Sequence, residues 1–104
     1  MIGDGPLVQV AQRAVDLERA SAFYAHLLEV PVAATFDPPG LAFLLLGDTR
    51  LLLERGAPSA LLYFAVDATL GPSGTEERMA FLTDSEGNTV ALVEHRPREA
   101  RAGA

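Results

Sequence analysis

The chain has 104 residues, of which 49% are hydrophobic and 21% are charged, and its net charge is −6. This length and composition fit one globular domain with a small core and argue against disorder. The acidic balance argues against nucleic-acid binding, which depends on clustered basic side chains. Because the chain contains no cysteine, disulfides and thiolate metal sites are excluded.

No segment of the sequence points to a membrane or to export. The apolar runs are far shorter than a membrane-spanning helix. The first five residues show no basic segment followed by an apolar one, which a secretory signal would need. We therefore expect no membrane partner and a cytoplasmic location.

The first half of the chain predicts one helix among four strands. A strand is expected at residues 7–13, where Val8 and Val10 point one way and their neighbours the other. Further strands are expected at residues 32–36, 41–46 and 50–54, with a turn at residues 37–40. The strand at 41–46 is nearly all apolar, so we expect it to be buried on both faces.

The predicted helix follows the first strand and has clear ends. Asp16 suits the N-cap position, and Glu18 places negative charge near the positive end of the helix dipole. Pro31 disfavours helical geometry at the residue before it and ends the helix. The apolar positions form one stripe along about three turns: Leu17, Ala20, Phe23, Tyr24, Leu27 and Leu28.

The second half repeats part of the first. Strands are expected at residues 61–67, 79–83 and 89–94, the last two joined by a turn at residues 84–88. The segment 68–76 is too short, and too rich in glycine and proline, for a helix plus a strand. These features predict a single domain with a first module at about 7–55, an eroded second module at about 60–95 and a frayed tail at 96–104.

Three segments of the chain together resemble the vicinal oxygen chelate superfamily, which contains glyoxalase I, bleomycin-resistance proteins and extradiol dioxygenases. The segments are residues 15–28, residues 63–67 and the turn Asp-Ser-Glu-Gly-Asn at 84–88. The resemblance implies an α+β fold in which paired βαβββ modules form a cupped mixed sheet. In this chain the helix and one strand of the second module would be shortened or missing.

The resemblance also implies where a metal ion would be held, on the first and last strands of each module. These positions fall on Gln9, Leu51, Leu61 and Ala91. One amide oxygen cannot hold a divalent ion. Strand alternation places Glu54 and Glu94 on the face opposite Leu51 and Ala91. We therefore expect no metal, no cofactor and no catalytic residue, which argues against an enzyme.

The predicted cup is mainly apolar, as small-molecule sites commonly are. Counting alternate residues from the same four positions adds Ala11, Arg13, Leu53, Tyr63, Ala65 and Val93. Arg13 and Tyr63 could orient a ligand; Phe36, Phe43 and Phe81 would add ring surface, but the sequence does not fix which way they face. The predicted ligand-binding residues are Gln9, Arg13, Leu51, Leu61, Tyr63 and Ala91, and the alternative is that these side chains only fill a core.

The second module would leave one sheet face uncovered, because it lacks the helix. That face carries Leu62, Phe64, Val66, Leu82, Val90 and Leu92. Monomers rarely expose such a large apolar patch. We expect a homodimer to cover it, with the C-terminal tail as the alternative.

These expectations favour a metal-free, small-molecule-binding protein of the glyoxalase/bleomycin-resistance type. It would sequester an apolar, aromatic or cationic compound, such as an antibiotic, without turnover. One alternative is a glyoxalase-like, metal-dependent lyase, isomerase or dioxygenase. The other is a non-catalytic structural or regulatory dimer.

Overall fold

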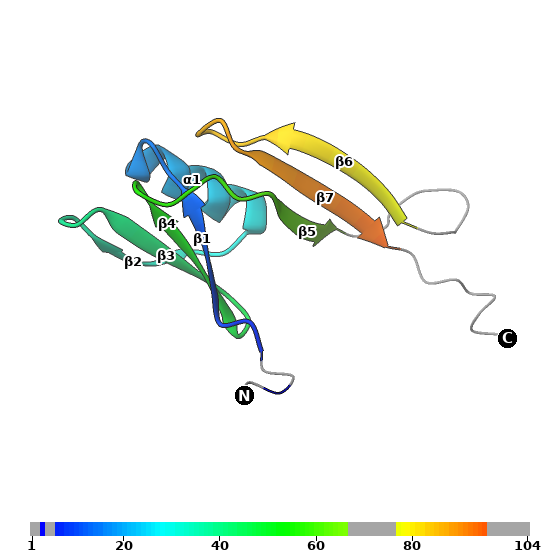
Figure 1. Ribbon diagram of the computed structural model, residues 1–104, viewed down its shortest axis with the longest axis horizontal. Coiled ribbons are helices and arrows are strands. Elements are labelled where there is room, and N and C mark those ends of the chain that lie inside the picture. Colours follow the sequence, from blue (N-terminus) through cyan, green and yellow to red (C-terminus); the bar gives the residue numbers. More distant parts are fainter. Residues whose placement is uncertain (1–2, 4–5, 67–76, 96–104) are drawn as a thin grey trace, which may run out of the picture. The chain divides into compact units, whose positions relative to one another are not determined.

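The computed structural model describes residue 3, residues 6–66 and residues 77–95 (Figure 1). Its elements confirm the predicted order, with boundaries shifted by at most two residues. They are β1 (Gln9–Arg13), α1 (Leu17–Leu28), β2 (Val32–Phe36), β3 (Leu41–Leu46), β4 (Thr49–Glu54), β5 (Leu62–Val66), β6 (Glu77–Thr83) and β7 (Thr89–His95). The predicted loop at 68–76 and the tail at 96–104 lie outside the described residues. No helix in the described part is both long and apolar enough to cross a membrane.

Helix α1 begins and ends as local chemistry dictates. The Asp16 carboxylate accepts a hydrogen bond from the Arg19 backbone N–H at 3.0 Å, which satisfies one of the free donors of the first turn. At the other end, Glu29 adopts a left-handed conformation (φ 57°) and its N–H bonds back to the Ala25 carbonyl. The helix therefore stops just before Pro31.

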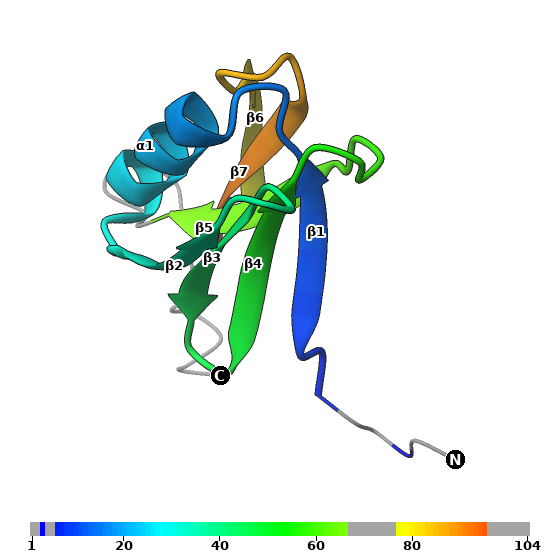
Figure 2. The same ribbon diagram turned by 90° about the vertical axis from the view of Figure 1, so that its left-hand side faces the viewer.

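Residues 1–60 and the turn at 84–88 form one compact unit. Its sheet has the strand order β1-β4-β3-β2, with β1 parallel to β4 and the other pairs antiparallel. Helix α1 packs along one face of this sheet, against β2, β3 and β4 (Figure 2). We call this the helix face and the opposite surface the open face.

The strand register decides which side chains the helix covers. Leu51 lies opposite Val10 and Leu44, and the next matching row pairs Leu53 with Gln12 and Ala42. All of these except Val10 are fully buried. The prediction that residues 41–46 are buried on both faces is wrong, because the helix of the described residues packs on the other face and Leu45 is 53% exposed.

Residues 61–83 and 89–104 form the second compact unit. Its described strands pair in the order β5-β7-β6, with β5 parallel to β7 and β6 antiparallel to it. This order repeats β1-β4-β3 of the first unit, and the described part of the second unit holds no helix. The described chain is thus an α+β fold with seven strands in two mixed sheets and one helix.

Candidate functional site

The open face of the first sheet carries two of the predicted ligand-binding residues. Gln9 pairs in register with Arg50, and Arg13 pairs with Glu54. Registered partners on adjacent strands share a face, so all four side chains belong to the open face. Between these two rows lies Leu52, which is 9% exposed and forms the floor.

Two phenylalanines and an arginine form an aromatic surface on this face. The Phe36 and Phe43 rings meet edge to face, with centroids 6.2 Å apart. The Arg50 guanidinium lies 4.9 Å from the centroid of the Phe43 ring, within cation–π range. Phe36 is 48% exposed and Leu45 53% exposed, so ring and aliphatic surface remain accessible beside the cation.

Gln9 adds an unused hydrogen-bond acceptor next to Arg50. Its Oε1 atom is buried and has no hydrogen-bond partner among the described residues. A buried polar atom without a partner costs free energy, which a donor from a bound molecule would recover. The open face therefore combines ring surface, positive charge and a free acceptor.

The predicted position of Leu51 is wrong. It was expected to face the same cup as Gln9 and Arg13, but it is fully buried on the helix face, and so is Leu53. The reason is the parallel register, which sets Gln9 opposite Arg50 and Val10 opposite Leu51. Counting along single strands could not reveal this offset.

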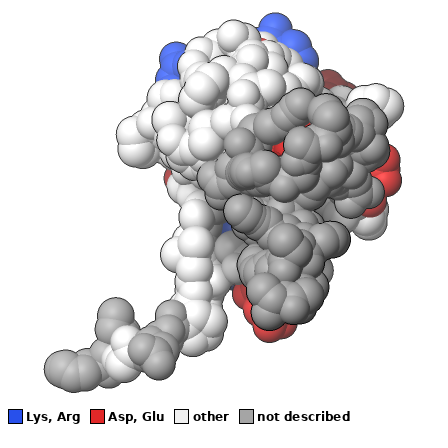
Figure 3. All heavy atoms as spheres, turned by 90° about the vertical axis from the view of Figure 1, so that its right-hand side faces the viewer, with Lys and Arg blue, Asp and Glu red and all other residues white. Residues whose placement is uncertain are grey.

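The remaining predicted residues lie on the second sheet and share one face there. Tyr63, Ala91 and Phe81 lie in one row of paired strands. Ala91 is fully buried, whereas Tyr63 is 56% and Phe81 59% exposed; Leu61, just before β5, is 47% exposed. We call the face of the second sheet that carries Leu61, Tyr63 and Phe81 the Tyr63 face. One side of the whole molecule is drawn in Figure 3, where most of the described surface is uncharged.

The opposite face of the second sheet is less exposed than the sequence suggested. Val90 is fully buried, and Leu62, Phe64, Leu82 and Leu92 are intermediate. Val66 is 40% exposed. The largest exposed apolar side chains of this unit therefore lie on the Tyr63 face.

The described residues do not fit a bound divalent ion. Leu51, Leu61 and Ala91 carry no donor atoms. Glu54 shares the open face with Gln9, which the sequence reasoning missed, but the two positions are about 13 Å apart along the paired strands. In the described part of the chain, no three His, Asp or Glu side chains gather closely enough to hold a metal.

The turn at 84–88 is joined to the start of α1 through a buried carboxylate. Glu86 accepts two hydrogen bonds from the Arg19 guanidinium, at 2.8 and 3.1 Å, and one from the Asp16 backbone N–H at 2.7 Å. Ser85 donates a further bond at 2.7 Å. These donors, above all Arg19, lower the pKa of Glu86 from 4.5 to about 2, because they favour its charged form.

A second buried carboxylate holds the same turn together. Asp84 accepts from the Tyr24 hydroxyl on α1 and, at 2.8 Å each, from the backbone N–H groups of Glu86 and Asn88. The Asn88 amide donates to the Arg13 carbonyl at 2.9 Å. Burial, followed by the bond to Asp84, raises the pKa of Tyr24. Two of the segments that carried the family resemblance, residues 15–28 and 84–88, thus have a structural role: they fix the end of β1, and with it the backbone of Arg13.

Gln12 was missed by the sequence reasoning although it is fully buried. Its amide donates to the Ala60 carbonyl at 2.8 Å and accepts from the Ala60 N–H at 2.7 Å. These bonds tie β1 to the chain that follows β4. The available signal was a polar side chain on the apolar side of the alternation begun by Val8 and Val10.

Comparison with known proteins identifies the fold. Neither a protein-family model nor a curated protein matches the sequence. Solved structures do match: TnmS3, an antibiotic-binding protein from Streptomyces sp. CB03234, is 19% identical, with a TM-score of 0.66 over 88% of this chain and 96% of that one. A lactoylglutathione lyase from Agrobacterium tumefaciens is 19% identical, with a TM-score of 0.64 over 86% and 93%.

A glyoxalase/bleomycin resistance protein/dioxygenase from Alicyclobacillus acidocaldarius is 14% identical, with a TM-score of 0.62 over 91% of this chain and 95% of that one. At such identities the likeness concerns the fold alone. It confirms the fold that the resemblance in the sequence implied: this chain folds like the glyoxalase/bleomycin-resistance proteins.

Proposed function

We propose that this protein binds a small planar aromatic molecule on the open face of the first sheet and sequesters it without a metal ion. The observation that carries this proposal is the accessible group formed by Phe36, Phe43 and Arg50. Aromatic rings and a guanidinium favour stacking of a flat ring system. TnmS3, an antibiotic-binding protein among the structural neighbours, supports the binding of a small molecule.

The ligand carries a hydrogen-bond donor at one edge. Gln9 lies in register with Arg50 on this face, and its unpartnered Oε1 would accept from that donor. Arg13 and Glu54 lie farther along the same face and would contact polar substituents. An analogue without the donor should bind more weakly, because Gln9 would stay unpaired.

A metal-dependent lyase is the second candidate, favoured by the lactoylglutathione lyase among the neighbours. The donor set argues against it, because Leu51, Leu61 and Ala91 provide no ligand atoms. Metal analysis of protein purified without chelator separates the two functions. A stoichiometric divalent ion would favour the lyase and contradict sequestration without a metal.

Binding can be tested by calorimetric titration with a flat aromatic antibiotic such as doxorubicin. Phe43→Leu keeps an apolar side chain but removes the ring and should weaken binding by about fivefold, since such ring contacts contribute about 1 kcal/mol. Phe23→Leu is the matched control, because Phe23 lies on α1 and packs edge to face against Tyr24. If both variants lose the same affinity, or if both bind as tightly as the unmodified protein, the open face is not the binding site.

We further propose that a second copy of the chain docks on the Tyr63 face. Tyr63, Phe81, Leu61 and Met79 are between 47% and 59% exposed there, and a partner commonly covers a group of exposed apolar side chains of this kind. A structural or regulatory dimer without a ligand would use the same face. Light scattering should give a dimer mass that Phe81→Ser converts to a monomer; a monomeric unmodified protein would refute this part.

A further inference from the structure

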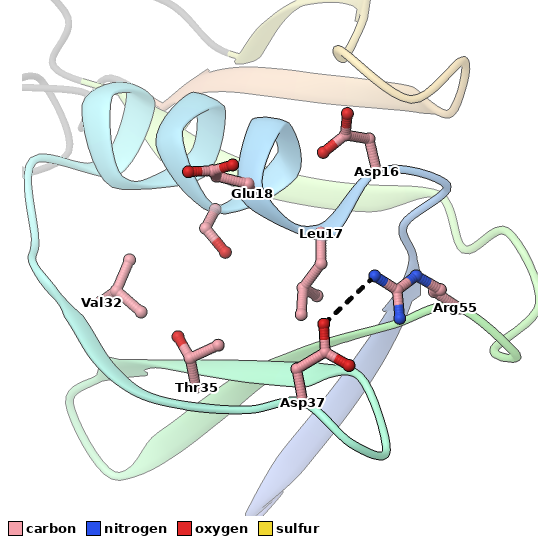
Figure 4. A pocket seen from close by; sticks show the side chains of 8 residues that line it. Asp16, Leu17, Glu18, Val32, Thr35, Asp37 and Arg55 are labelled. Carbon is pink, nitrogen blue, oxygen red and sulfur yellow. Dashed lines mark ion pairs between the residues drawn. The ribbon is translucent and has the colours of Figure 1, made fainter.

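A cavity lies in the first unit, between the start of α1 and β2 (Figure 4). Its volume is about 480 Å³, within the range of small-molecule sites. Val32 lies opposite Leu44 and Thr35 opposite Ala42, so the cavity opens on the helix face. It is therefore on the other side of the sheet from the aromatic group of the open face.

The lining combines an apolar body with an excess of negative charge. Leu17 and Val32 provide the apolar walls, and the hydroxyls of Ser21 and Thr35 also line the space. The lining contains three carboxylates and one guanidinium: Asp16, Glu18 and Asp37, and Arg55. A net negative lining in a partly enclosed space attracts cations and repels anions.

Ser21 points to a ligand independently of these charges. The residue is only 8% exposed, yet its hydroxyl lines the cavity. Its Oγ makes no hydrogen bond with any described residue, not even with the carbonyl one turn back that helical serines often use. The Oγ atom itself is not fully enclosed, so it can be reached from the cavity, where a polar ligand group would bond to it.

The one cation of the lining is already engaged. Arg55 forms an ion pair with Asp37 at 3.6 Å, drawn in Figure 4. Its guanidinium also lies over Gly40, where φ is +101° and an added Cβ would collide with Nη1. Glu18, on the helix side of the cavity, makes no ion pair within the described residues. A positive ligand group therefore finds there a carboxylate that has no side-chain cation of the described residues paired with it and only the positive end of the α1 dipole beside it.

We propose that this cavity binds a small organic amine that carries a hydroxyl or similar polar group. The ammonium group would lie near Glu18 and Asp37, the aliphatic body against Leu17 and Val32, and the polar group at Ser21 Oγ. This site is separate from the open face and does not depend on the proposed function.

The test is an NMR titration of the full chain with three matched probes: 4-amino-1-butanol, 1,4-butanediol and 4-hydroxybutyrate. They differ only in carrying a positive, neutral or negative end. The aminobutanol should shift the amide signals of Leu17, Ser21, Val32 and Thr35 in a saturable way, at least about fivefold more tightly than the others, as expected for one exposed charge pair of about 1 kcal/mol. No saturable shift, or equal binding of the hydroxybutyrate, would overturn the proposal.

Two variants locate the interaction. Glu18→Gln should weaken aminobutanol binding about threefold or more, while Glu29→Gln, the same change at the other end of α1, should leave it unchanged. Equal weakening by both would show attraction to net charge alone and refute the site. Ser21→Ala should keep the fold, because alanine favours helices, and still weaken binding; unchanged affinity would exclude the hydroxyl contact.

Discussion

The two sheets pair their strands in the same way but bury them differently. In the first sheet, α1 covers one face and Leu44, Leu51 and Leu53 are fully buried beneath it. In the described second sheet only Val90 and Ala91 are fully buried, and Tyr63 and Phe81 are more than half exposed. Strand pairing therefore sets the topology of each unit, whereas the helix supplies most of the hydrophobic core. The following substitutions test that difference, from the largest expected effect to the smallest.

Leu51→Ala should lower the free energy of unfolding by about 2–5 kcal/mol, because it leaves a cavity under α1. Leu45→Ala is the matched control on the open face, where the side chain is 53% exposed, and should cost less than about 1 kcal/mol. Urea denaturation measures both. Similar losses would mean that the helix does not determine burial in this sheet.

Tyr24→Phe should lower the free energy of unfolding by about 1–3 kcal/mol, because it leaves the buried Asp84 carboxylate without the tyrosine donor. Tyr63→Phe makes the same change on the second sheet, where the side chain is 56% exposed, and should be neutral within about 0.5 kcal/mol for the dissociated chain at low protein concentration. The two variants should be compared by thermal and urea unfolding. A neutral Tyr24→Phe would show that the bond to Asp84 contributes little.

Glu86 should make stability depend on pH. Its pKa is lowered from 4.5 to about 2 by Arg19 and its other donors, so its stabilisation is complete above pH 4.5 and is lost as the pH falls toward 2. Because Arg19 is half exposed, we expect this contribution to be only about 1–2 kcal/mol.

Glu86→Gln should remove that part of the acid dependence and be less stable than the unmodified protein near neutral pH. The difference between the two proteins should shrink as the pH approaches 2. Glu29→Gln, at the exposed end of α1, serves as the control. It should leave the pH dependence of the free energy of unfolding as it is in the unmodified protein. Identical acid curves for Glu86→Gln and the unmodified protein would contradict the assignment.

The smallest effect is expected on the Tyr63 face. Phe81→Ala should change the free energy of unfolding of the dissociated chain by less than about 0.5 kcal/mol, because the ring is 59% exposed. The measurement is urea unfolding at low protein concentration. A loss as large as that of Leu51→Ala would show that the second sheet has a core of its own on this face.

Much of the fold could be predicted because its signals are local. The cap at Asp16, the apolar stripe after it and the strand alternation all depend on neighbours along the chain. The turn at 84–88 was equally visible, and so was the repeat of strands in the second half. These features fixed the order of elements to within two residues at each boundary.

The site was harder to predict, because the register between paired strands decides which side chains share a face of the sheet. Alternation grouped Gln9 with Arg13 and Leu51 with Leu53, but nothing in the sequence relates one group to the other across β1 and β4. The same limit hid Glu54, which shares the open face with Gln9. The ring contact between Phe36 and Phe43 likewise depends on how β2 pairs with β3.

The sequence by itself determined where helix and strands form, because hydrophobic period and capping act over a few residues. Only the tertiary structure decided which polar groups are buried. Gln12 meets Ala60, and Tyr24 meets Asp84, across 48 and 60 positions of the chain. Such contacts exist only after the strands have paired and the turn has docked on α1, since hydrogen-bond partners so far apart in sequence leave no local pattern.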